Sequence, residues 1–181
     1  FAIMGEVYAR HALGIANPRI GLLSNGEEEG KGNEQIRETA ELLRKTKLNF
    51  TGNVEPKEVL LGGSVDVMVA DGFVGNIFIK TIEAVGSYLF KDIRTELTRD
   101  LRSKAGALMV KPALRRVYHG IDPFEIGGAP LLGVDGVVII GHGRTTAVGM
   151  KNAIRQAKQA VEGRIINELR AAFAHEAAVE S

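Results

Sequence analysis

The sequence of 181 residues contains no cysteine. This absence excludes disulfide bonds, thiolate zinc sites and a thiol nucleophile. A large charge of one sign is also missing, because 23 Lys and Arg residues stand against 22 Asp and Glu residues, for a formal net charge of +1. This balance gives the whole chain no electrostatic preference for nucleic acid. No apolar run approaches the roughly 20 residues that span a bilayer, and no secretory signal pattern opens the sequence.

What is present is the composition of a globular protein, with 45% hydrophobic and 25% charged residues. These proportions exclude intrinsic disorder, a coiled coil and a collagen-like fibre, and the length suits one domain. Glycine is frequent, at 22 residues, and the chain opens on Phe1 with a helical pattern from Ala2 to Gly14. From this opening we expect the sequence to be cut from a longer one.

Short apolar runs alternate along the chain with longer helical patterns. Runs such as Val65 to Ala70 are typical of parallel strands that helices cover on both faces, so the predicted class is α/β with a mostly parallel, doubly wound sheet. About four strands are visible, fewer than in an average sheet, so we expect further strands outside this sequence. The predicted strands are 19–24, 48–51, 65–70 and 137–140, and the predicted helices are 34–47 capped by Asn33, 56–61, 77–101, 104–118 interrupted by Pro112, and 150–173.

Three glycine-rich loops follow predicted strands and precede predicted helices: Ser24 to Asn33, Asp71 to Asn76, and Gly141 to Thr146. In an open parallel sheet, ligands bind at the carboxyl ends of the strands. Glycine lets the backbone approach a ligand, and the free N–H groups at a helix N-terminus favour an anion. We therefore predict that the three loops converge into a phosphate-binding cleft. The alternative for each loop is ordinary turn chemistry, with Asn33 and Asn76 as simple helix caps.

Two side chains in these loops are functional candidates. His142 lies between two glycines and is a better candidate than the other three histidines, although a turn-capping role is equally open. Asp71 ends an apolar strand, so it is either partly buried with a shifted pKa or only the first residue of a turn. The acidic residues 27–29 indicate a solvated loop more than a metal site.

The sequence contains no Walker A motif, no GxSxG elbow and no HExxH motif. In a transfer of an acyl group to phosphate, the phosphate oxygen is itself the nucleophile, and no Ser–His pair or thiolate is needed to activate it. The protein then has to hold phosphate against the carbonyl and to donate hydrogen bonds to the developing oxyanion. Glycine-rich loops that carry Asn, Lys and His suit this chemistry.

Four ordered blocks resemble one family: SNGEEEGKGN, FTGNVEPKEVLLG, ADGFVGN and GGAPLLGVDGVVIIGHG. From roughly Met4 to Glu168 the chain is similar to the acyl-carrier-protein-dependent phosphate acyltransferases of bacterial phospholipid synthesis, the PlsX family. The resemblance implies transfer of a fatty acyl group from acyl carrier protein to inorganic phosphate, without a cofactor. It also implies a dimeric, three-layer α/β/α fold like those of isocitrate and isopropylmalate dehydrogenases and phosphotransacetylases. Because chains of this family are longer, residues 1–181 would be the carboxyl-terminal part of one α/β domain, with the amino-terminal half as a partner.

The resemblance also implies roles for the loop residues. Asn33, Asp71 and His142 would be catalytic. Lys31 and Asn33 would contact phosphate or the acyl carbonyl, and Asp71 and Asn76 would position the same groups. His142 would protonate the departing phosphopantetheine thiolate or orient the carbonyl. No metal is expected. The predicted phosphate- and substrate-binding residues are Gly26, Lys31, Gly32, Gly72, Gly75, Asn76, Lys80 and Gly143, of which Lys80 is equally well explained as a surface lysine.

The segment from Lys91 to His119 is strongly basic, with eight Lys and Arg residues against three Asp and Glu residues, a net charge of +5. Residues 105–110 (AGALMV) are predicted to form an apolar tip in a basic helical hairpin over about 77–119. Such a hairpin suits an anionic membrane surface or an acidic carrier protein, and the alternative is a dimer interface with solvated charges. The resemblance favours a cytoplasmic protein, peripherally associated with the inner face of the membrane. The predicted membrane or carrier contacts are Arg102, Lys104, Leu108, Met109, Val110, Lys111 and Arg115.

Three other functions stay open. A phosphotransacetylase-like enzyme that uses acyl-coenzyme A has a related fold, but a small thioester has no use for a basic hairpin. A nicotinamide-dependent dehydrogenase is disfavoured because no GxGxxG follows a strand. A membrane- or partner-binding half without an intact site is the non-enzymatic alternative.

Overall fold

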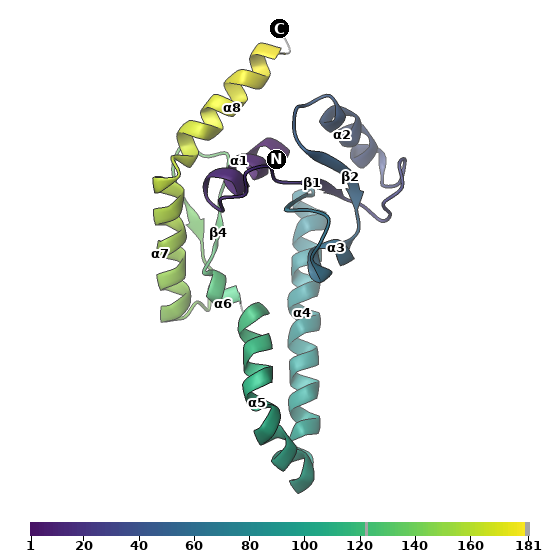
Figure 1. Ribbon diagram of the computed structural model, residues 1–181, viewed down its shortest axis with the longest axis vertical. Coiled ribbons are helices and arrows are strands. Elements are labelled where there is room, and N and C mark those ends of the chain that lie inside the picture. The colour runs from purple at the N-terminus through teal and green to yellow at the C-terminus, as the bar shows by residue number, and fades with distance from the viewer. Residues whose placement is uncertain (122, 180–181) are drawn as a thin grey trace.

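The computed structural model describes residues 1–121 and 123–179. Its fold is mixed α/β, with a three-stranded parallel sheet flanked by helices and a separate two-stranded antiparallel ribbon (Figure 1). The predicted α/β class is therefore confirmed. The helices are α1 (Ala2–His11), α2 (Glu34–Arg44), α3 (Pro56–Leu61), α4 (Gly72–Leu97), α5 (Leu101–Ile121), α6 (Pro123–Ile126), α7 (Ala147–Glu162) and α8 (Ile165–Val179), and the strands are β1 (Ile20–Leu23), β2 (Phe50–Val54), β3 (Val67–Val69), β4 (Ala129–Pro130) and β5 (Ile139–Ile140).

The parallel sheet has the strand order β2-β1-β3, so β1 is its central strand. All four residues of β1 are buried, as the apolar run IGLL predicts. Gly21 is needed there because a Cβ at this position would lie 2.6 Å from Val54 Cγ1 and 2.7 Å from Val65 Cγ1. Helices α1 and α2 pack against the sheet in one core cluster, which comprises Ala2, Ile20, Leu22, Ala40, Leu43 and Val69.

A second core cluster joins α1 to the carboxyl-terminal part of the chain. Val7 of α1, Ala160 of α7 and Leu169 of α8 are buried together, and Leu132 and Val137 from the loop between β4 and β5 pack against them. Because α1 contributes to both clusters, it connects the parallel sheet to the ribbon, and Figure 1 shows it between these two parts.

Helices α4 and α5 extend from the rest of the molecule as a long pair (Figure 1). They contact one another, and none of the 26 residues of α4 is buried. The connection between them is residues 98–100, and the Asp100 carboxylate accepts a hydrogen bond from Ser103 N at 2.8 Å at the start of α5. The predicted tip at residues 105–110 is therefore wrong: these residues lie within α5, which also continues through Pro112.

Two predictions for the carboxyl-terminal part are also wrong. The predicted buried strand 137–140 is reduced to β5, which pairs antiparallel with β4, and Ile140 is 55% exposed. The single helix predicted over 150–173 is divided into α7 and α8 at Gly163 and Arg164. Arg164 has a left-handed φ of 50°, and a Cβ on Gly163 would lie 2.5 Å from the carbonyl oxygen of His11. The break thus lets the chain pass close to the end of α1.

Candidate functional site

The first predicted loop follows β1 and is held by its own side chains. Asn25 Oδ1 accepts a hydrogen bond from Gly32 N at 3.0 Å, which draws the two ends of the loop together. Asn33 Oδ1 accepts from Ile36 N at 2.9 Å and so caps α2, as predicted. Gly32 has a φ of +93°, and a Cβ there would lie 2.5 Å from Ile36 Cγ2, so both its backbone and its surroundings require glycine.

Two of the three acidic residues of this loop form ion pairs with neighbouring cations. Lys57 Nζ lies 2.8 Å from Glu27 Oε1, and Arg44 Nη2 lies 2.7 Å from Glu29 Oε1. Within residues 1–121 and 123–179, no three His, Asp or Glu side chains are grouped as metal ligands. An open groove of about 290 Å³ lies beside the loop, but neither Lys31 nor Asn33 lines it; its lining residues are Glu27, Glu29, Arg44, Phe50, Thr51, Gly52 and Asn53.

The second loop is shorter than predicted because α4 starts early. Asp71 is the N-cap of α4, and its Oδ1 accepts hydrogen bonds from Phe73 N and Val74 N, both at 2.9 Å. The predicted helix start after Asn76 is therefore wrong, and Gly72, Gly75 and Asn76 lie in the first turns of α4. A carboxylate is favourable at this position because it satisfies free N–H groups and the helix dipole.

Lys80 lies further along α4 and is paired within the helix. Its Nζ is 3.3 Å from Glu83 Oε2, and 61% of its side chain is exposed. This arrangement is that of a surface lysine with an acidic neighbour three residues away.

The first two loops leave the same edge of the parallel sheet. They follow β1 and β3, which are hydrogen-bonded parallel neighbours. The third loop, residues 141–146, follows β5 in the antiparallel ribbon instead, and Figure 1 shows the start of α7 beside α6, away from the start of α4. The expectation that all three loops leave one sheet is therefore wrong. The structure brings together the loops of Asn33 and Asp71, and it places His142 in another part of the molecule.

Backbone hydrogen bonds within the third loop fix the orientation of His142. His142 Nδ1 accepts a hydrogen bond from Arg144 N at 3.2 Å, and the carbonyl of His142 accepts from Thr145 N at 2.8 Å. Acceptance at Nδ1 places the proton of the neutral ring on Nε2. Thr146 then caps α7, since its Oγ1 accepts from Gly149 N at 3.2 Å. Gly143 has open space where a Cβ would be.

An ion pair that was not predicted from the sequence connects two strands of the parallel sheet. Arg19, just before β1, donates from Nε and Nη2 to the carboxylate of Asp66, just before β3, at 3.0 Å each, and its Nη1 donates to the carbonyl of Gly63. The hydrogen bonds that the side chain and the backbone N–H of Arg19 donate to this carboxylate lower the pKa of Asp66 to about 2. Opposite charges immediately before two apolar strands are the signal that predicts such a pair in a parallel sheet.

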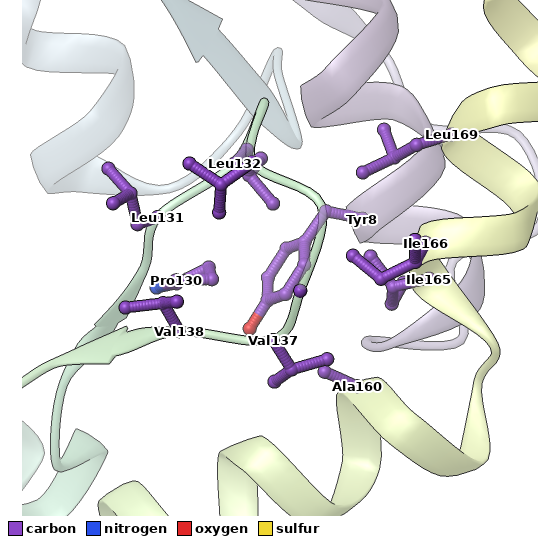
Figure 2. Close-up of a pocket in the computed structure, with 12 residues that line it drawn as sticks. Tyr8, Pro130, Leu131, Leu132, Val137, Val138, Ala160, Ile165, Ile166 and Leu169 are labelled. Carbon is purple, nitrogen blue, oxygen red and sulfur yellow. The ribbon is translucent and has the colours of Figure 1, made fainter.

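Figure 2 shows a cavity of a different character, which is lined almost entirely by apolar side chains. Tyr8 from α1 lies across the loop between β4 and β5, and burial raises the pKa of its phenol. Around it are Val137 and Val138 from that loop, and Ala160, Ile165 and Leu169 from α7 and α8. No charged side chain lines the cavity, so it continues the second core cluster and carries no chemistry of its own.

The predicted contact residues of the basic segment lie on α5. Its apolar residues are exposed, with exposed fractions of 73% for Leu108, 84% for Met109 and 43% for Val110. At 100° per residue, Lys104, Lys111 and Arg115 lie on one side of the Leu108 position, and Arg102 lies near Met109. Leu108 and Met109 are thus bordered by cations on both sides. Among the helices of the described residues, none has the length and apolar content needed to cross a membrane.

Comparisons with known proteins agree with the loop motifs. The model of a family described as "Fatty acid synthesis protein" matches residues 1–168. A phosphate acyltransferase of Pelotomaculum thermopropionicum is 47% identical over 173 residues, which are 96% of this chain and 50% of that protein. A phosphate acyltransferase of Aquifex aeolicus is 50% identical over 157 residues, 87% of this chain and 46% of that protein. The chain therefore spans about half the length of the curated relatives that it matches.

Proposed function

Because the chain belongs to the family of fatty acid synthesis proteins, we propose that it is the carboxyl-terminal half of a phosphate acyltransferase. The complete enzyme would transfer a fatty acyl group from acyl carrier protein to inorganic phosphate and supply acyl phosphate for phospholipid synthesis. The relatives that support this proposal are named phosphate acyltransferases. No cofactor enters the proposed reaction.

The observation that carries the proposal is the placement of the first two loops. Both leave the carboxyl end of neighbouring parallel strands, and each ends in a capped helix N-terminus. This is the position at which open parallel sheets bind ligands, and at which helix amides favour an anion. At α4 the N-terminus is already occupied by the Asp71 carboxylate. We therefore assign phosphate to the α2 side, near Lys31 and Asn33, and assign Asp71 the positioning of α4.

The proposed chemistry needs few groups. A phosphate oxygen attacks the thioester carbonyl carbon, a C–O bond forms, the C–S bond breaks, and the phosphopantetheine sulfur leaves as a thiolate. Asn33 uses Oδ1 for capping, which leaves Nδ2 to donate to phosphate or to the developing oxyanion. During this step the Nε2–H group of His142 would donate a hydrogen bond to the departing thiolate, which water then protonates, in agreement with the tautomer that Arg144 N selects. This step requires the complete protein to bring the third loop to the first two.

The carrier protein is proposed to bind α5. Arg102, Lys104, Lys111 and Arg115 are on the segment of net charge +5, which complements an acidic carrier protein. Replacement of Lys104 and Lys111 by Glu should then slow the reaction of the complete enzyme with acyl carrier protein as donor. The rate with acyl-coenzyme A should be unchanged. Unchanged rates with both donors would contradict carrier-protein binding on α5 and favour the phosphotransacetylase-like alternative.

The homodimer that we propose would cover α4. Four apolar residues recur at steps of four or eight along this helix, and each is between 41% and 51% exposed: Ile77, Val85, Leu89 and Ile93. Such a ridge on a helix without buried residues is suited to packing against a second copy.

The test uses a fusion protein that joins the unmatched half of the Pelotomaculum thermopropionicum relative to residue 1 of this chain. The variant Asn33→Asp keeps a good N-cap and loses the Nδ2 donor, so the thermal unfolding midpoint should be retained. Acyl phosphate formation should fall by about 10²-fold, as for loss of an oxyanion donor. Gln35→Ala, on the same turn, is the matched control. Activity of Asn33→Asp within a few-fold of the parent would show that the site is misplaced.

A further inference from the structure

The ribbon formed by β4 and β5 has one bare face. Register pairs Ala129 with Ile140 and Pro130 with Ile139, and Leu131 N donates to the Val138 carbonyl at 2.8 Å. Directly opposed residues share a face, and faces alternate along a strand. One face therefore carries Ala129, Leu131, Val138 and Ile140. These four residues are all exposed, with exposed fractions of 43%, 44% and 55% for Leu131, Val138 and Ile140.

The opposite face of the ribbon is covered. Pro130 and Ile139, which lie between the exposed residues, are only partly exposed, and α7 contacts both strands. Leu132 and Val137, which have the same alternation as Pro130 and Ile139, pack against the second core cluster. The ribbon thus has one apolar face packed and one apolar face largely in solvent, on which Leu131 and Val138 also border the apolar cavity.

This pattern differs from that of an antiparallel ribbon at a protein surface. Surface ribbons alternate apolar residues toward the core with polar residues toward water. Here both faces are apolar, as in a sheet that lies between two layers. Within the described residues, β4 and β5 pair only with each other, so the ribbon also has two open edges to which further strands can be added. A two-stranded ribbon is marginal without additional packing.

We propose that the amino-terminal half of the complete protein packs on this bare face, so that the ribbon lies between two layers of the fold. The occupant is indicated by length, since the chain spans 50% of the Pelotomaculum thermopropionicum relative, and the rest of that protein is of similar size. The proposal rests on family membership and not on acyl transfer. It assigns Val138 and Ile140 to the interface between the two halves.

The absence of cysteine allows a direct test with single thiols. Ile140→Cys is introduced into this chain and into the fusion protein, and the rate of maleimide labelling is measured. Labelling should be about tenfold or more slower in the fusion protein, because the thiol becomes accessible only by local opening. Leu42→Cys on α2, where the parent side chain is 64% exposed, should label equally fast in both proteins.

Each outcome decides the proposal. Equal labelling of Ile140→Cys in the chain and in the fusion protein would overturn it. Slower labelling of the chain alone at higher protein concentration would also overturn it, since the occupant would then be a second copy. Because labelling requires no turnover, a protected thiol in an inactive fusion protein would reject the proposed acyl transfer and retain the interface.

Discussion

At the scale of single residues, the two caps at the sheet edge differ in what they leave for a ligand. Asp71 accepts from two backbone N–H groups with one carboxylate oxygen and brings a negative charge to the start of α4. Asn33 accepts from one N–H group and is neutral. A phosphate dianion is repelled by the first cap and not by the second. The amide cap with Lys31 nearby is therefore the better half of the predicted phosphate site.

At Gly127 both the backbone conformation and the neighbouring atoms require glycine. Its φ is +99°, and an added Cβ would lie 2.4 Å from Ala153 N and 2.6 Å from Asn152 C in α7. We expect Gly127→Ala to lower the free energy of unfolding by about 2–4 kcal/mol, from backbone strain and from displacement of α7. Urea denaturation measures this loss. Gly136→Ala is the control, because a Cβ there meets no atom within 4 Å, and equal stability of both variants would contradict the prediction.

The ion pair of Arg19 and Asp66 predicts a pH dependence of stability. Hydrogen bonds from Arg19 lower the pKa of Asp66 to about 2 in the folded protein, while an unfolded aspartate titrates near 3.9. The pair therefore stabilises the fold above about pH 4, and this stabilisation disappears as the pH falls through about 2. The difference in thermal unfolding midpoint between the parent and Asp66→Asn should be constant from pH 7 to 5 and shrink toward pH 2. A difference that does not change with pH would contradict this assignment.

At the scale of elements, sequence patterns predicted the kinds of element better than their ends. The apolar run at β1 and the Asn33 cap of α2 were readable because both signals are local. The start of α4 was misplaced because Asn76 and Asp71 are both good caps, and only the bonded amides of Phe73 and Val74 distinguish them. The break between α7 and α8 depends on the contact of Gly163 with the end of α1, which no local pattern records.

Helix α5 is the element that we predict to bind an anionic membrane surface. Its exposed Leu108 and Met109 lie among lysine and arginine residues, as in helices that bind anionic interfaces. We expect Leu108→Glu with Met109→Glu to reduce binding to anionic phospholipid vesicles at least about tenfold, from loss of apolar contact and added repulsion. Vesicle co-sedimentation measures the binding. Leu42→Glu on α2 is the matched control, and unchanged sedimentation of the double variant would contradict membrane association through α5.

At the scale of the whole molecule, the site could be predicted only in part. The residues of the first two loops were placed correctly at one edge because β1 and β3 are parallel neighbours. The third loop was misplaced because the run Val137 to Ile140 has the composition of a buried parallel strand, and in this chain its partner is β4. A strand's sequence reports how buried it is in the complete protein, and it does not report which chain segment covers it.

The proposed site is divided between two parts of the molecule, which leads to a prediction about activity. Positioning accounts for much of catalysis in a transfer to phosphate, and His142 lies on the ribbon while Asn33 lies on the parallel sheet. We therefore expect this chain alone to form acyl phosphate at less than about a hundredth of the rate of the fusion protein. Trapping of acyl phosphate with hydroxylamine measures both rates. Circular dichroism of the chain should retain the helical signal of the fold, so that the loss of activity is not caused by unfolding. Comparable rates for the chain and the fusion protein would show that residues 1–181 hold a complete site.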